Sequence, residues 1–196
     1  YVYKRTGSSW VQEAYIKAAN NDNKDEFGSS LSLGKDVLAV GAINESSNQT
    51  TITNGTGASS DNSKYRSGAV YVYKRTGTTW AQEAYIKASN SGNGDRFGSK
   101  VALSGNTLAV GTFLEDSNLT TITNDTTASS SNDDGMHQSS GAVYIYKRTG
   151  NTWTQEAYIK AANNNAEDWF SKSIALDNDT LAVGAMYESS NQTTIT

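Results

Sequence analysis

The chain has no cysteine, no proline and a single histidine, His137. Without a thiol there is no disulfide and no cysteine nucleophile, and one loop imidazole gives a Ser-His-Asp site little to build on. No apolar run approaches the ~20 residues that span a bilayer. The 16 basic and 20 acidic residues leave a formal net charge of −4 with no basic stripe, which argues against nucleic acid as a partner.

One sequence unit fills most of the chain in three copies, at residues 1–42, 71–112 and 144–185. The first two copies are identical at 26 of 42 positions. Trp10 and Trp80 are 70 residues apart, and Trp80 and Trp153 are 73 apart. Periods of this length, far above those of helical-hairpin repeats, indicate a stacked or radial array of small β-sheets.

The first half of each unit predicts a hairpin. In the second copy, valines and tyrosines alternate over 69–73, as in a strand with two different faces. A short loop with Gly77 follows. The next strand is then expected to place four residues on one face: Trp80, Ala84, Ile86 and Ala88.

The second half of the unit predicts another hairpin. After Phe97-Gly98, Val101 and Leu103 share a face, and the turn 104–106 reverses the chain. The apolar stretch 108–111 lacks alternation, which is typical of a strand covered on both faces. Helices are not expected. Four strands in two hairpins are the content of one propeller blade.

The stretches DRFGSKVALSGNTLAVGT and SGAVYVYKRTGTTWAQEAYIKAS resemble FG-GAP repeats of large secreted bacterial proteins, which are related to the blades of the integrin α-subunit propeller. The matching signature residues are Phe27, Gly28, Phe97, Gly98 and Phe170. The resemblance implies an all-β, propeller-type array of four-stranded antiparallel blades. It also implies an extracellular or cell-surface location.

The phase of the repeats predicts about three blade equivalents: an outer half-blade at 1–22, blades at 23–92 and 93–165, and an inner half-blade at 166–196. The chain is expected to be a fragment of a longer repeat protein. Because closed propellers have roughly four to eight blades, the array should be open or completed by other copies. The most buried strands should contain Ala39, Ala109 and Ala182.

Two departures from the family pattern matter. Ser171 follows Phe170 where a glycine is usual, so the turn should be altered or its packing relaxed. The calcium loop of integrin-type blades shrinks here to 34–36, 104–106 and 177–179, too short to supply six to eight oxygen ligands. No cofactor is therefore expected to be required, and calcium would bind only in the long loops.

The acidic residues recur with the period. Asp25, Asp95 and Asp168 precede the Phe and are expected to cap backbone N–H groups of the turn. A second set is interpreted as solvated loop acids, with calcium ligation as the alternative: Glu45, Asp61, Glu115, Asp133, Asp134 and Glu188. A catalytic pair would break the symmetry that these acids obey, so an enzyme is not expected.

Aromatic residues also recur, on the strands. Taken alone they resemble a sugar-binding platform, but their repetition favours packing between blades: Tyr1, Tyr3, Tyr71, Tyr73, Tyr144, Tyr146, Trp10, Trp80 and Trp153. The long polar connections 43–67 and 113–140 are where partner contacts are expected. Glycosylation sequons begin at Asn44, Asn48, Asn54, Asn118, Asn124 and Asn191, and at Asn178 within a tight turn.

These features favour a non-enzymatic structural or adhesive module, secreted or on the cell surface, that contacts other copies, further repeats, or surface proteins and glycans. The alternative is a multivalent carbohydrate-binding propeller with one pocket per blade. A polysaccharide-active enzyme is less favoured, because it would need two suitably spaced carboxylates in a groove.

Overall fold

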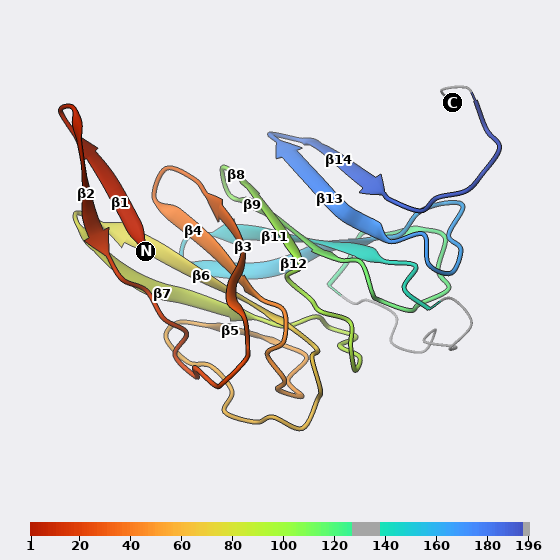
Figure 1. Ribbon diagram of the computed structural model, residues 1–196, viewed down its shortest axis with the longest axis horizontal. Coiled ribbons are helices and arrows are strands. Elements are labelled where there is room, and N and C mark those ends of the chain that lie inside the picture. The colour runs from red at the N-terminus through yellow and green to blue at the C-terminus, as the bar shows by residue number, and fades with distance from the viewer. Residues whose placement is uncertain (127–137, 194–196) are drawn as a thin grey trace.

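The computed structural model describes residues 1–126 and 138–193, and all the regular structure in them is β-strand (Figure 1). Two hairpins flank two larger sheets in this part of the chain. The first hairpin joins β1 (Val2–Thr6) and β2 (Ser9–Ala14). The last joins β13 (Phe170–Asp177) and β14 (Thr180–Ala185).

The two larger sheets have the same topology. The first has the order β3-β4-β6-β7-β5, with β3 (Phe27–Leu33), β4 (Val37–Ala42), β5 (Ile52–Asn54), β6 (Ala69–Thr76) and β7 (Thr79–Ile86). The second has the order β8-β9-β11-β12-β10, with β8 (Lys100–Ser104), β9 (Thr107–Thr112), β10 (Ile122–Thr123), β11 (Ala142–Thr149) and β12 (Thr152–Ile159). All strand pairs are antiparallel, as predicted.

Each larger sheet has one strand more than the four predicted. The extra strands, β5 and β10, come from the long polar connections and pair with the outer strands β7 and β12. Their amide groups gain ladder partners at an edge that would otherwise be open. The long connections are therefore partly ordered by the sheets that they leave.

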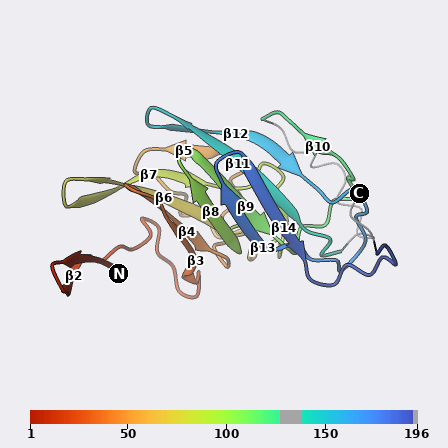
Figure 2. The same ribbon diagram turned by 90° about the horizontal axis from the view of Figure 1, so that it is seen from above.

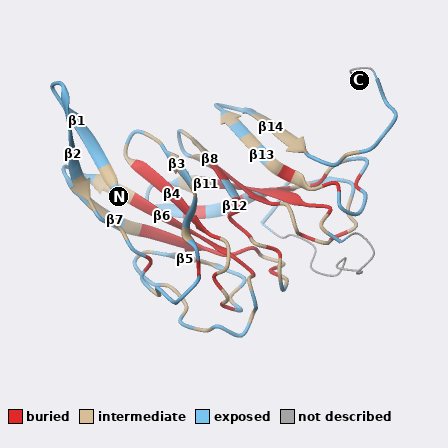
Figure 3. Ribbon diagram, viewed as in Figure 1, coloured by how far each residue is buried: buried red, intermediate tan, exposed pale blue. Residues whose placement is uncertain are grey.

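The sheets follow one another in chain order and pack face to face, as Figure 2 shows from above. One core cluster lies between the two larger sheets and joins Val70 and Val72 to Tyr144 and Tyr146. A second lies between the first hairpin and the first larger sheet, and a third between the second larger sheet and the last hairpin. The array is thus a row of stacked β-sheets whose inner strands are the most buried (Figure 3).

Burial of the inner strands differs along the row. Every residue of β4 is buried, and Ala39 and Ala109 have no exposed surface, as predicted. Ala182 in β14 is exposed, which contradicts the prediction. Its side chain lies on the face that would meet a following sheet, and the described chain has none there.

Trp80 lies on the opposite face of β7 from Ala84, Ile86 and Ala88, contrary to the prediction, because β7 contains a bulge. The pairs Val72 with Ala84 and Tyr73 with Gln82 leave Glu83 as an extra residue in β7. An extra residue reverses the alternation of a strand. Trp80 therefore packs in the cluster of the tyrosines, whereas Ala84, Ile86 and Ala88 lie in the cluster on the other face.

Candidate functional site

The Phe97-Gly98 pair fastens the second larger sheet to the segment before it. The Phe97 amide donates to the carbonyl of Ser67 at 2.9 Å, and the buried ring meets Tyr144 edge-on at 5.3 Å. Gly98 has a φ of 86°, and a Cβ there would lie 2.7 Å from the Ala69 carbonyl oxygen. The pair thus combines a left-handed turn with a backbone approach that a side chain would obstruct.

Ser171 adopts the same turn as Gly98, although it carries a side chain. Its φ is 74°, in the left-handed region, and the Phe170 amide still donates to Ser140 at 2.9 Å. The Ser171 hydroxyl is buried without a hydrogen-bond partner. The turn is therefore not rearranged, and the departure from glycine is accommodated as local strain.

The bulged glutamates join consecutive sheets through their side chains. Glu83 accepts hydrogen bonds from Arg148 Nε at 2.8 Å and Nη2 at 2.5 Å, and from Trp153 Nε1 at 3.0 Å. Glu13 accepts the equivalent bonds from the guanidinium of Arg75 and from Trp80 Nε1. We call each such set, a bulged Glu with the Arg and Trp of the next sheet, a glutamate clamp.

The clamps are electrostatically strong. Hydrogen bonds from Arg75, followed by that from Trp80, lower the pKa of Glu13 to about 2. Burial acts to raise the pKa of Glu83, but the bonds from Arg148 and Trp153 outweigh it and the pKa stays below its ordinary value. These glutamates were not among the site residues predicted from the sequence. Their signal was the motif Gln-Glu-Ala-Tyr-Ile-Lys at the same offset in all three copies.

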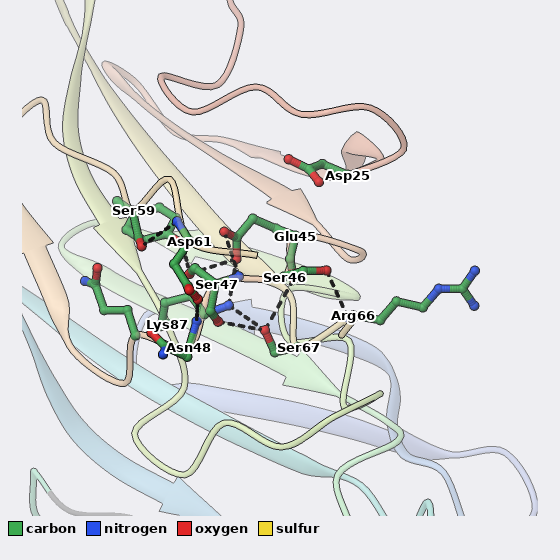
Figure 4. A network of polar contacts seen from close by, with 12 residues as sticks. Asp25, Glu45, Ser46, Ser47, Asn48, Ser59, Asp61, Arg66, Ser67 and Lys87 are labelled. Atoms are coloured by element: carbon green, nitrogen blue, oxygen red, sulfur yellow. Dashed lines mark hydrogen bonds and ion pairs between the residues drawn. The ribbon is translucent and has the colours of Figure 1, made fainter. Parts of the chain in front are cut away.

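A second polar network is buried at one end of each larger sheet, and Figure 4 shows the one in the first of these sheets. Glu45 and Lys87 are each about 1 % exposed and form an ion pair of 2.6 Å, and Lys87 also donates to Ser67 at 2.7 Å. Glu115 and Lys160 repeat the pair at 2.8 Å. Burial lowers the pKa of both lysines, and the facing glutamate opposes that shift.

This network corrects the interpretation of Glu45 and Glu115 as solvated loop acids. Both side chains are buried, because each pairs with the buried lysine that directly follows β7 or β12. As for the calcium alternative, each carboxylate faces an ammonium group rather than further acids. Among the described residues, no group of three or more acidic, His or Cys side chains could hold a metal ion.

The other two candidate acids that the structure describes accept hydrogen bonds from polar groups of the loops. Asp61 accepts from the amides of Asn48 and Ser63, and Glu188 bonds Asn163 and Ser190. Asp133, Asp134 and His137 lie outside the described residues. The turn acids behave as predicted, because each accepts from the amide three residues before it: Asp25 at 3.2 Å, Asp95 at 2.6 Å and Asp168 at 2.9 Å.

The repeated aromatic residues pack between sheets, as predicted, wherever a sheet faces them. Tyr71, Tyr144 and Trp153 are almost fully buried. The equivalents in the first hairpin, Tyr1 and Trp10, are 73 % and 68 % exposed. Position in the row, rather than residue type, decides whether these rings are buried.

The sequons lie on or near the long connections. Asn48, Asn54, Asn124 and Asn191 are exposed, and Asn44 and Asn118 are half-buried. The Asn54 amide is already engaged across sheets, since it exchanges hydrogen bonds with the backbone of Trp153. A glycan at Asn54 would therefore compete with a contact between the two larger sheets.

Residues 1–126 and 138–193 contain no helix long and apolar enough to cross a membrane. A comparison with curated protein sequences gave no significant match. The model of the FG-GAP repeat, in contrast, matches three segments, 10–73, 80–125 and 153–194, which together cover most of the chain. Each segment begins at the Trp of one copy of the unit and runs past the end of that copy, and the all-β row of antiparallel sheets agrees with blades of a β-propeller. The chain belongs to the FG-GAP repeat family.

Proposed function

We propose that this chain is a non-enzymatic structural or adhesive module, secreted or displayed on a cell surface, that mediates assembly and protein–protein contacts. One observation carries the proposal: the repeated polar groups are engaged in packing, the clamps between consecutive sheets and the Glu-Lys pairs between the two hairpins of one sheet. The glutamate clamps and the buried Glu-Lys pairs recur in equivalent positions. A catalytic site needs groups that differ from one repeat to the next, and the polar residues that recur here serve packing.

The exposed parts of the row support the same role. The long connections present polar residues and sequons on a rigid scaffold, where recognition commonly takes place. No cofactor is required in this proposal. The alternative, a lectin with one pocket per blade, is favoured only by the repetition itself, because the aromatic rings that would stack on sugars are buried between sheets where sheets are complete.

A glycan array probed with the folded chain tests the proposal. The structural module should show no saturable binding to any one sugar and no release of reducing ends from polysaccharides. It should be retained on a surface coated with the same chain, whichever residues mediate that retention. Saturable binding to one sugar, inhibited by that free sugar, would favour the lectin and overturn the proposal.

A further inference from the structure

Several departures from the repeat gather at one junction, between the second larger sheet and the β13-β14 hairpin. There β13 lies against β8 (Figure 2). Because the groups that recur serve packing, groups that do not recur are candidates for another role. Those at this junction, with their equivalents in the other two copies in parentheses, are Arg96 (Glu26, Trp169), Lys100 (Ser30, Ser173), Phe113 (Ile43, Met186), Trp169 (Glu26, Arg96) and Lys172 (Ser29, Ser99).

Two aromatic rings from opposite sides of the junction hold Lys172. Phe113 directly follows β9, Trp169 directly precedes β13, and their ring centroids are 5.3 Å apart. Lys172 Nζ lies 3.8 Å from the centroid of Phe113 and 4.4 Å from that of Trp169, within the range of cation–π attraction. All three side chains are half-buried. The junction therefore presents a surface that is both aromatic and cationic.

The cations of the junction lack acidic partners. Among the residues that the structure describes, no carboxylate forms an ion pair with Arg96, Lys100 or Lys172. Burial lowers the pKa of Lys172, and the charges of Lys100 and Arg96 lower it further, so the three cations are close enough to repel one another. In a chain with a net charge of −4, three neighbouring cations without partners form a local site of attraction for anionic groups.

The backbone is strained at the same place. Ser171, between Trp169 and Lys172, has a φ of 74° and a buried hydroxyl without a hydrogen-bond partner, where the other copies have glycine. Strain of this kind concentrates at binding sites. The departure from glycine thus lies beside the departures in charge and ring type.

Both sides of the junction belong to the described chain. Arg96, Lys100 and Phe113 come from the second larger sheet, and Lys172 meets that sheet at the Phe113 ring. Ser29, the equivalent of Lys172 in the first larger sheet, is exposed although that sheet has both of its hairpins and a further sheet after it. A following sheet therefore does not cover this position.

We propose that this surface, the basic aromatic junction formed by Arg96, Lys100, Phe113, Trp169 and Lys172, binds an acidic segment of a partner protein. Carboxylates of the segment meet the three cations, and its apolar side chains pack on the two rings. Cations from two strands suit a ligand with more than one charge, whereas a single inorganic anion would leave the rings unused. Trp and Arg are also enriched among the residues that dominate protein–protein interfaces. This inference rests on the proposed role in protein–protein contacts and names the chemistry of the partner.

Selection of a random peptide library on the folded chain tests the inference. The selected peptides should be enriched in Asp and Glu together with aromatic or aliphatic residues. A dye-labelled copy of one selected peptide then measures affinity by fluorescence anisotropy, and added salt should weaken its binding. Peptides without acidic enrichment would overturn the inference. Inorganic phosphate that competes more strongly than sodium chloride at equal ionic strength would also overturn it, because the ligand would then be a small oxyanion.

The other copies of the unit supply substitutions that preserve the fold. Lys100→Ser combined with Lys172→Ser introduces the residue that both other copies carry at each position, and should weaken peptide binding about tenfold. Trp169→Arg, which takes the residue of the second copy, should also weaken binding although it adds a positive charge, because it removes a ring that packs against the peptide.

The matched control removes two exposed lysines elsewhere, again in favour of residues of other copies. Lys24→Gly combined with Lys35→Asn should leave the affinity unchanged. Equal affinities of the wild type and the Lys100→Ser, Lys172→Ser variant, or an equal loss in the control, would refute the assignment. A chain that selects no acidic peptide, yet lacks glycan binding and is retained on the coated surface, would leave the proposed function standing without this inference.

Discussion

Glu83 of one sheet receives the guanidinium of Arg148 from the next through two hydrogen bonds, of 2.8 and 2.5 Å. The carboxylate reaches across only because a bulge turns it out of the alternation of β7. The indole N–H of Trp153 donates at 3.0 Å to Oε2, the carboxylate oxygen that also accepts from Arg148 Nε. The bulge in β7 thus places the side chain that attaches the following sheet.

Replacing Glu83 by Gln should destabilise the fold by about 1–3 kcal/mol, the usual cost of losing charge-assisted hydrogen bonds in a buried setting. The amide cannot accept both guanidinium bonds. Denaturant unfolding followed by tryptophan fluorescence measures the change, since Trp153 is itself in the clamp. Glu167→Gln, on an exposed side chain, is the matched control and should be neutral. Equal stabilities of the two variants would contradict the clamp's role.

Acidification should weaken the clamps. The folded-state pKa of Glu13 is about 2 and that of Glu83 is lowered, against an ordinary value of 4.5. A depressed carboxyl pKa contributes stability that is complete above pH 4.5 and is lost as the pH falls toward 2. Burial raises the pKa of Asp25, which acts in the opposite direction.

The net pH effect can be assigned with variants. Unfolding free energies measured between pH 7 and pH 2.5 should decline below about pH 4.5 in the wild-type chain. The decline should be shallower when Glu13→Gln and Glu83→Gln are combined. If the double variant loses stability as steeply as the wild type, the acid sensitivity arises elsewhere.

Replacing Lys87 by Met should cost about 3–5 kcal/mol, because it leaves the Glu45 carboxylate buried without its cation. Adding Glu45→Gln should recover much of the loss, since the uncompensated charge is removed. Lys35→Met, at an exposed turn, serves as the control. Chemical unfolding of the three variants provides the measurement, and a loss in the double variant as large as in Lys87→Met would refute this account.

Replacing Ser171 by Gly should stabilise the chain by about 1 kcal/mol, because glycine tolerates a φ of 74° and removes a buried hydroxyl that has no partner. Two glycine-to-serine changes separate the cost of backbone strain from the cost of a close contact. Gly28→Ser adds only backbone strain, since nothing lies within 4 Å of its Cβ position, whereas Gly98→Ser also meets the Ala69 carbonyl. Melting temperatures should fall least for Gly28→Ser.

Chelation should leave the fold intact. The inner turns are short, and Glu45 and Glu115 are paired with lysines, so the sheets do not need a cation to balance these charges. Thermal melts with and without a chelator should coincide to within the effect of ionic strength. Collapse of the β-sheet signal in chelator would show that a metal in the long connections supports the fold.

The sequence predicted the larger-scale order of the fold well. The alternation over 69–73 gave the correct faces, because a strand with two different neighbours follows period-two patterning. The unbroken apolar run at 108–111 correctly gave a strand buried on both faces. The face of Trp80 could not be predicted in this way. A bulge has no signature in hydrophobic pattern alone, and the polar Glu83 that forms it looks like any outward residue.

The site was harder to predict for a related reason. Glu45 lies in a polar stretch and looks solvated, yet its partner Lys87 is 42 residues away and reaches it only through the fold. Short polar strands such as β5 are equally hidden, since they gain stability from an edge that already exists. Local sequence reveals what a strand prefers, but not which distant group it meets.

Because each sheet presents tyrosines to the sheet before it and valines to the sheet after it, the row has a direction, with a front unlike its back. Any unit copied in frame carries both surfaces with it. Duplication or loss of a whole repeat in the gene would therefore recreate a matched contact at either side without a compensating mutation. The length of such a protein is free to vary over generations while its interfaces stay the same.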